Sequence, residues 1–236
     1  MTVSLKQIKL NLQTLSSQED ARFLQRFFKT GKGQYGEGDL FLGIRVPVLR
    51  KLAKQYDDVS IDDAACLLRS KFHEERMLAL IILVNRHRKG NLSEKEAVYQ
   101  IYLGHTKYIN NWDLVDTSAE HIIGAHLLDR DRKPLYDFAV SADLWERRIA
   151  ILSTFHFIRR NQFDDTLTIS QILIIDREDL IHKAVGWLLR EVGKRDMEAE
   201  ESFLKNHYRN MPRTMLRYAI EKFPEAKRRL YLKGEI

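Results

Sequence analysis

The hydrophobic pattern that runs through the whole chain is that of amphipathic α-helices. Segments such as "DARFLQRFFKT" (20–30) and "HEERMLALIILVNRHRK" (73–89) place apolar residues three or four positions apart. No segment alternates as a convincing β-strand does, and no Asn-Gly hairpin turn occurs. The chain has only 4 prolines and 11 glycines, few for a protein with many tight turns. The sequence therefore predicts an all-α fold.

Local signals set the expected helix boundaries. Pro47 suits the first turn of a helix, and the segment "SEKE" predicts a capping box between Ser93 and Glu96. In the second half of the chain we expect helices near 112–124, 134–141, 144–159, 164–174, 178–195, 197–207, 212–221 and 223–232.

A basic residue followed three positions later by a small one recurs along these helices. The pairs are Arg76 and Ala79, Arg147 and Ala150, and Lys183 and Gly186. Ala79 and Ala150 are 71 residues apart, Gly186 follows after 36, and Ala219 after a further 33. A period in this range is typical of HEAT-like antiparallel helix pairs. We predict a superhelical solenoid forming a single domain over 1–236, with a non-repeating helix bundle as the alternative.

The segment "GKGQYG" matches the pattern of a dinucleotide-binding loop only in its letters. Such a site needs a preceding strand and a helix directly after the glycines. Here a helical pattern precedes Gly31, and "EGDLFLG" follows the segment. We interpret 31–38 as a loop, which with Lys29, Lys32 and Tyr35 is either an arm that touches nucleic acid or a plain connector.

Basic side chains line several of the expected helix faces, and the chain carries a formal net charge of +6. The groups are Lys183, Arg190 and Lys194 around Trp187; Arg209, Arg213 and Arg217; and Arg50, Lys51 and Lys54 beside Pro47. In a solenoid such faces can stack into one concave, positive surface that follows a phosphate backbone. Alternatively, each is an ordinary solvated helix face, with Trp187 packed under the stems of its cationic neighbours.

Several function classes are excluded or disfavoured by composition. The one cysteine, Cys66, excludes an intrachain disulfide and a cysteine-rich zinc site, and the eight histidines show no metal-ligand spacing. The longest apolar run, "MLALIILV" (77–84), is too short to cross a bilayer, and the first residues lack a signal peptide's apolar stretch. We expect a cytoplasmic protein that needs no metal or cofactor and contacts no membrane.

The segment "INNWDLVD" (109–116) places Trp112 and Asp116 on one face of a helix, because residues four apart are neighbours there. Asn110 or Asn111 can cap this helix, and Asp113 suits its positively polarised first turn. Asp116 lacks such an explanation. Trp112 and Asp116 are therefore a candidate site, although a buried aspartate can also simply cap or pair.

Four segments together resemble the AlkD family of DNA alkylation-repair glycosylases. They are "FLGIRVPVLRKLAK" (41–54), "NNWDLVD" (110–116), "LWERRIAIL" (144–152) and "IHKAVGWLLRE" (181–191). The similarity extends from about residue 20 to 225. Asn111 departs from relatives that have a second aromatic residue at this position, and the loop 31–38 matches no family motif.

The resemblance implies a HEAT-like solenoid that acts as a monomer on double-stranded DNA and releases positively charged N3- and N7-alkylpurines. Carried over by position, it implies that Asp116 is the catalytic carboxylate and that Arg148 lies near the site. Trp112 and Trp187 would contact the sugar and backbone of the lesion. The expected DNA-binding cations are Lys51, Lys183, Arg190, Lys194, Arg209, Arg213 and Arg217. The alternatives are a non-catalytic HEAT-like DNA-binding protein and a scaffold for other proteins.

Overall fold

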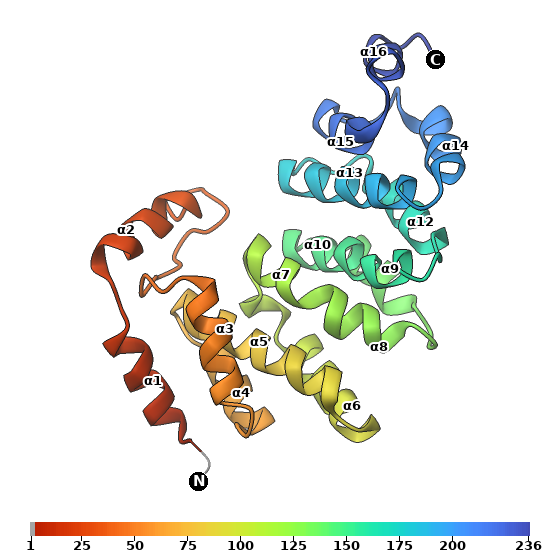
Figure 1. Cartoon of the computed structure of the whole chain (residues 1–236). Coiled ribbons are helices and arrows are strands. Elements are labelled where there is room, and N and C mark those ends of the chain that lie inside the picture. Colours follow the sequence, from red (N-terminus) through yellow and green to blue (C-terminus); the bar gives the residue numbers. More distant parts are fainter. Residues whose placement is uncertain (1–2) are drawn as a thin grey trace. The chain divides into compact units, whose positions relative to one another are not determined.

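The computed structural model describes residues 3–236, and over this range the chain is built from helices without a β-strand (Figure 1). The nearest approach to a strand is an isolated bridge between Leu40 and Phe72. The predicted all-α fold is confirmed. The chain divides into two compact units, Met1–His126 and Leu127–Ile236. This division does not test the expectation of a single domain over 1–236, which stays a prediction.

Unit 1 contains the helices of the N-terminal half. They are α1 (Leu5–Thr14), α2 (Gln18–Phe27), α3 (Val46–Gln55), α4 (Ile61–Leu68), α5 (His73–Lys89), α6 (Leu92–Gly104), η1 (Thr106–Tyr108), α7 (Trp112–Ala119) and the π-helical turn η2 (Glu120–Gly124), with α8 (Ala125–Leu127) at the boundary. Pro47 lies in the first turn of α3, as predicted.

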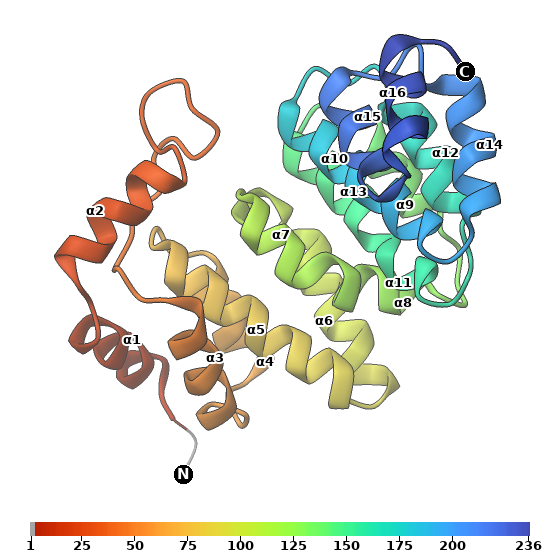
Figure 2. The same cartoon turned by 45° about the horizontal axis from the view of Figure 1, so that its top comes forward.

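Helix α5 is the centre of unit 1, and α3, α4, α6 and α7 pack against it (Figures 1 and 2). Apolar side chains occupy more than one face of this 17-residue helix, and Leu78, Leu80 and Leu83 are fully buried. A helix that is apolar around much of its circumference is stable only when neighbours cover several sides. The first turn of α5 is also buried although it carries charged residues, among them His73 and Glu74.

Unit 2 contains the remaining helices. They are α9 (Lys133–Ala139), α10 (Leu144–Ser153), α11 (Phe155–Ile158), α12 (Asp164–Leu173), α13 (Asp179–Gly193), α14 (Met197–His207), α15 (Arg213–Ala219), η3 (Ile220–Lys222) and α16 (Glu225–Lys233). One helix was predicted over 144–159, but the chain forms α10 and α11 instead. The hydroxyls of Ser153 and Thr154 bond to the carbonyls of Ile149 and Ile151, and such bonds bend or end helices.

Helices α13 and α15 approach each other closely because Gly186 has no side chain (Figure 2). A Cβ at position 186 would lie 2.4 Å from the Met215 carbonyl oxygen and 2.5 Å from the Tyr218 Cβ. Ala219, the small residue predicted to follow in the repeat, is fully buried on α15. The small residues thus allow neighbouring helices to pack, as the repeat pattern predicts.

The basic residues of the repeat also occupy equivalent positions in the two units. Arg76 on α5 donates to the Ser70 carbonyl, and Arg147 on α10 donates to the Ser141 carbonyl, each six residues earlier. Each guanidinium also pairs with a buried carboxylate, Asp39 at 2.8 Å for Arg76 and Asp176 at 2.6 Å for Arg147. This shared pattern supports a common helix-pair repeat.

Two smaller observations complete the fold. The capping box predicted from Ser93 and Glu96 is wrong by two residues: Asn91 and Glu94 form it, so α6 begins at Leu92. An asparagine serves as well as a serine at this position. From residue 3 onward, no helix combines the length and apolar character that crossing a membrane requires.

Candidate functional site

Helix α7 begins at Trp112, and Asn111 caps it. The buried Asn111 side chain accepts a hydrogen bond from the Trp112 backbone N–H at 2.8 Å, so this asparagine fulfils the predicted capping role. Asn110 has a different task, because its amide donates to Asp39 at 3.2 Å. The two asparagines thus fix both the start of α7 and its attachment to the loop before α3.

Trp112 and Asp116 lie one turn apart on the same, partly exposed face of α7. Both side chains are half-buried, whereas Leu114, Val115 and Ser118 are fully buried on the inner side. The structure therefore brings this predicted pair together. Neither residue belongs to the fully buried core.

The Trp112 indole packs against two phenylalanines at the end of α2. Its ring centroid lies 5.4 Å from that of Phe28, at an interplanar angle of 32°, and 6.1 Å from that of Phe27. Phe27 is 54% exposed and Phe28 is buried. These contacts hold the indole in one place while part of its surface stays accessible.

The Asp116 carboxylate lies close to the phenol of Tyr102 on α6. Burial raises the pKa of Tyr102, and the negative charge of Asp116 raises it further. The Tyr102 hydroxyl forms a hydrogen bond of 3.0 Å with the Ser118 hydroxyl. The Tyr102 phenol therefore stays neutral next to the Asp116 side chain.

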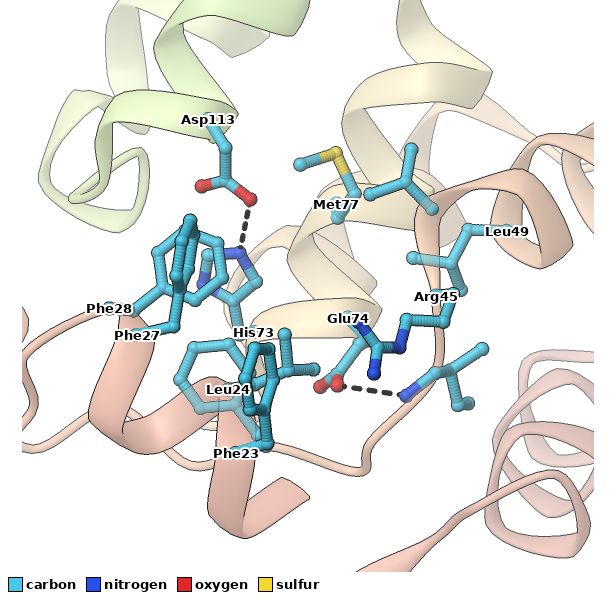
Figure 3. Close-up of a pocket in the computed structure, with 13 residues that line it drawn as sticks. Phe23, Leu24, Phe27, Phe28, Arg45, Leu49, His73, Glu74, Met77 and Asp113 are labelled. Carbon is cyan, nitrogen blue, oxygen red and sulfur yellow. Dashed lines mark hydrogen bonds and ion pairs between the residues drawn. The ribbon is translucent and has the colours of Figure 1, made fainter. Parts of the chain in front are cut away.

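Asp113 has a larger role than the helix-start position that the sequence suggested. Its Oδ2 is 2.9 Å from His73 Nε2, and His73 Nδ1 is 3.3 Å from Asp39 Oδ2. Burial alone would lower the pKa of His73, but the charge of Asp113 and hydrogen bonds to Asp113 and Asp39 raise it to about 9. Arg76 also pairs with Asp39. A buried imidazolium therefore ties the first turn of α7 to α5 (Figure 3).

Sequence reasoning missed His73, Asp39, Phe27 and Phe28. His73 and Asp113 are 40 positions apart, and no local motif relates them. The phenylalanines were visible only as part of an apolar helical pattern. A weak signal for His73 is its position in the charged segment "HEER", which directly precedes the apolar run of α5.

Unit 2 holds the other two predicted site residues, on helices that pack together. Trp187 on α13 is half-buried, and its ring centroid lies 5.7 Å from that of Phe155 in an edge-to-face arrangement. Arg148 on α10 is only 5% exposed and donates to the Leu180 carbonyl at 2.5 Å. Arg148 thus anchors the first turn of the helix that carries Trp187.

The predicted DNA-binding cations differ in their partners. Lys183 pairs with Asp179 at 2.7 Å, Lys194 with Glu191 at 2.6 Å, and Arg190 with Glu221. Over residues 3–236, by contrast, Lys51, Arg213 and Arg217 are exposed and form no ion pair. The cations of α13 therefore carry less uncompensated charge than the sequence indicated.

Arg209 does not continue the face of Arg213 and Arg217. The chain leaves α14 before Arg209 and caps α15 with Pro212, so only Arg213 and Arg217 share a helix. Proline interrupts a helix because it lacks a backbone N–H. The Arg209 guanidinium instead bonds to the Tyr208 hydroxyl at 3.0 Å.

The site offers a carboxyl group and an adjacent indole, which suit a cationic or electron-poor ligand. Within the described part of the chain, no three His, Cys, Asp or Glu side chains are arranged to hold a metal ion.

Comparisons with known proteins place these observations in context. A family model described as "DNA alkylation repair enzyme" matches residues 8–223. A solved structure of a predicted DNA alkylation repair enzyme from Enterococcus faecalis has a TM-score of 0.70 and 17% identity, covering 89% of this chain and 97% of that one. AlkD2 from Streptococcus mutans has a TM-score of 0.54 and 18% identity, covering 94% and 100%. The comparison with curated proteins found no match.

Proposed function

The chain belongs to the family of DNA alkylation repair enzymes, and on that premise we propose that it is a DNA N-glycosylase. Its substrates are positively charged N3- and N7-alkylpurines in duplex DNA. One observation carries the proposal: Trp112 and Asp116 share a partly exposed face of α7, beside a fully buried one. Membership of the family makes DNA the substrate, whereas the lesion, the duplex form and the monomeric state belong to the proposal.

An alkylated purine with a formal positive charge needs little help to leave. When the bond between C1′ and the purine nitrogen breaks, its electron pair neutralises the ring, so no general acid is required. The barrier then lies in the sugar, which becomes oxocarbenium-like. A carboxylate held beside the sugar stabilises this developing charge more strongly than it stabilises the ground state.

Asp116 is the group we assign to this task. In the proposed reaction its carboxylate faces the sugar cation and orients a water molecule. The water oxygen bonds to C1′, and its proton passes to the carboxylate. The products are a free alkylpurine and an abasic sugar with a hydroxyl at C1′. The Tyr102 phenol beside Asp116 stays neutral, because burial and the nearby carboxylate raise its pKa.

Trp112 and Trp187 provide the aromatic surfaces. A cationic nucleotide against an indole face gains about 0.5–2 kcal/mol. Each indole rests on a phenylalanine, Trp112 on Phe28 and Trp187 against Phe155, so little side-chain freedom is lost on binding. Of the cations, the unpaired Lys51, Arg213 and Arg217 are the strongest candidates for phosphate contacts.

The proposal is tested by incubating the protein with methylated duplex DNA and measuring free 7-methylguanine and 3-methyladenine. We expect release by the wild type and a loss of about 100- to 1,000-fold in rate constant for Asp116→Asn. Asp62→Asn, which changes an exposed carboxylate of α4, serves as the control and should react as the wild type does.

Two other outcomes would be informative. Equal release by Asp116→Asn and wild type would remove Asp116 from the reaction. DNA binding by both proteins without base release by either would identify a non-catalytic DNA-binding member of the family.

A further inference from the structure

A basic segment runs along α2 and into the loop that follows this helix. Between residues 21 and 36 the chain has four cations and no carboxylate, and the cations are Arg22, Arg26, Lys29 and Lys32. All four are exposed, and within residues 3–236 none of them forms an ion pair. Two lie one turn apart on α2, and two lie in the loop, which projects beyond the end of the helix (Figure 2). We call residues 22–36 the basic arm.

Most of the carboxylates that flank the basic arm are engaged elsewhere. Asp20 pairs with Arg45, and Glu37 accepts a hydrogen bond of 2.7 Å from a backbone N–H of the loop. Asp39 is buried and belongs to the charge network of α5. Glu19 forms no ion pair with the arm in the described part of the chain. The positive charge of the arm is therefore largely uncompensated within the protein, and it attracts an anionic partner.

The loop part of the arm is closed at its base. The Gly36 N–H donates to the Lys29 carbonyl at 3.2 Å, so the two ends of the loop meet. Gly36 is buried at this contact, where a Cβ would lie 2.5 Å from the Phe28 carbonyl oxygen. Compact loops with closed ends are frequently functional. Because this loop is fixed internally, little conformational freedom is lost when its cations bind a ligand.

Lys29 occupies a backbone position that usually belongs to glycine. Its φ is 52°, and it follows the end of α2 in a Schellman motif, in which the Thr30 N–H donates to the Gln25 carbonyl and the Lys29 N–H to the Arg26 carbonyl. A residue with a Cβ is strained in this conformation, whereas glycine is not. Strain of this kind is often retained at functional sites. A lysine at this position therefore indicates that its charge is used.

A depression of about 600 Å³ lies between α2 and the loop. Its lining contains two guanidinium groups and no carboxylate, and consists of Arg22, Gln25, Arg26, Thr30, Gly31 and Gln34. The Gln34 amide oxygen accepts a hydrogen bond from the Gly31 N–H at 2.9 Å, which leaves the amide NH₂ group as a donor. Guanidinium and amide donors commonly bind phosphate oxygens. The depression therefore suits an anion with several oxygens, such as a phosphodiester.

We propose that the basic arm binds the phosphate backbone of DNA beside the face that carries Trp112 and Asp116. Continuity with that face favours DNA as the partner, because Phe27 and Phe28 at the end of α2 both contact the Trp112 ring. A duplex that reaches Trp112 therefore passes close to Arg26 and the loop. The inference deepens the proposed function and rests on it for the identity of the partner. Contacts of this kind position a strand without reading its sequence.

The first experiment measures binding of unmodified duplex DNA by fluorescence anisotropy at several salt concentrations. The double variant Arg22→Gln/Arg26→Gln should reduce the steepness of log K against log salt by about 1.8, because each phosphate contact contributes about 0.9. The matched control is Lys95→Gln/Lys205→Gln, which removes two charges from α6 and α14, where neither lysine forms an ion pair within residues 3–236. The control should keep the wild-type slope. Equal slopes for the wild type and both variants would overturn the inference.

Lys29 allows the charge to be separated from the backbone conformation. Lys29→Gly removes the charge and relieves the strained φ, so the slope should fall by about 0.9 while the thermal unfolding midpoint does not decrease. Lys29→Arg keeps the charge and should keep the wild-type slope. A reduced slope in Lys29→Arg as well would show that the conformation of the loop matters rather than its charge, and would contradict the role given to Lys29.

A titration with inorganic phosphate distinguishes a DNA backbone from a small free anion. We expect no saturable binding of phosphate to the full chain by calorimetry, because a single phosphate engages only part of the arm. Saturable binding that disappears in Arg22→Gln/Arg26→Gln, together with unchanged DNA slopes, would identify a small-anion site and overturn the assignment to DNA.

The arm and the proposed reaction fail in different ways. With methylated duplex DNA, Arg22→Gln/Arg26→Gln should need more DNA for half-saturation but reach the wild-type single-turnover rate, because the arm contacts phosphates and not the reacting sugar. Asp116→Asn should lower the rate even at saturating DNA. The anisotropy measurement requires no base release, so absence of glycosylase activity would leave the result for the arm intact. A lower single-turnover rate at saturation in the arm variant would contradict a role limited to the backbone.

Discussion

The two units hold their predicted site residues in different ways. In unit 1, the helix that carries Trp112 and Asp116 is tied to its neighbours by buried charges, with His73 between Asp39 and Asp113. In unit 2, the helix that carries Trp187 is held by the Arg148 hydrogen bond to Leu180 and by close contact with α15, which Gly186 makes possible. The first arrangement depends on protonation and the second on volume. The two halves should therefore respond to different changes.

The largest effect should come from removing the charge at the centre of unit 1. His73→Ala removes the imidazolium that Asp39 and Asp113 share and leaves Arg76 as the remaining cation on Asp39. Breaking a buried pair typically costs about 3–5 kcal/mol. We expect faster hydrogen exchange in α5 and α7 and unchanged exchange in α13. His121→Ala, at an exposed histidine of η2, is the control. Unchanged exchange in His73→Ala would show that the charges do not hold α7.

The corresponding change in unit 2 adds a methyl group. Gly186→Ala places a Cβ against the Met215 carbonyl and Tyr218, and overpacking of this kind costs about 1–3 kcal/mol. In Gly186→Ala, hydrogen exchange should become faster in α13 and α15 only. Gly104→Ala, where no atom lies within 4 Å of the added Cβ, should leave stability unchanged or slightly raised. Equal effects of both variants would mean that α13 and α15 can separate without penalty.

The pH dependence of stability should sharpen the comparison. The pKa of His73 is raised from 6.5 to about 9 in the folded state. Its contribution is therefore complete below pH 6.5 and is lost as pH rises through about 9, at up to about 1.4 kcal/mol per pH unit. Unit 2 contains Glu200, whose pKa burial raises from 4.5 to about 8. The contribution of Glu200 to stability is therefore complete below pH 4.5 and is lost as pH rises through about 8.

Urea unfolding at a series of pH values measures both ranges. Glu200→Gln removes the carboxyl group whose pKa is raised in unit 2. The remaining loss of unfolding free energy should therefore fall between pH 6.5 and about 9. Between pH 8 and 9 the wild type and Glu200→Gln should lose stability in parallel. A Glu200→Gln curve that is flat over this interval would contradict the assignment of the upper range to His73.

The smallest expected effect concerns the surface cations. Arg213 is unpaired among the described residues, whereas Lys183 pairs with Asp179. If both contact phosphates, Arg213→Ala should lower the slope of log K against log salt by about 0.9. Lys183→Ala should change it less, because its charge is already compensated. Fluorescence anisotropy with duplex DNA at several salt concentrations measures both slopes. A larger change for Lys183→Ala would reverse this ranking.

Much of the local structure was predictable because it depends on near neighbours in the chain. The helical periodicity of 73–89 and 181–191 became α5 and α13, and the pairing of Trp112 with Asp116 on one face followed from their spacing. The errors were also local in origin. Ser153 and Thr154 ended α10 early, and the turn before Pro212 separated Arg209 from Arg213.

The sequence by itself determined the helices, the faces they bury and the positions where a small residue is needed. It also supplied the motif by which the chain resembles its family. Tertiary structure alone decided that Asp113 is bound by His73, that Phe28 supports Trp112, and that Arg190 is paired with Glu221. These contacts join residues far apart in sequence, between helices whose individual patterns do not specify partners. Periodicity encodes which side of a helix is buried, whereas the identity of the neighbour depends on packing the whole chain.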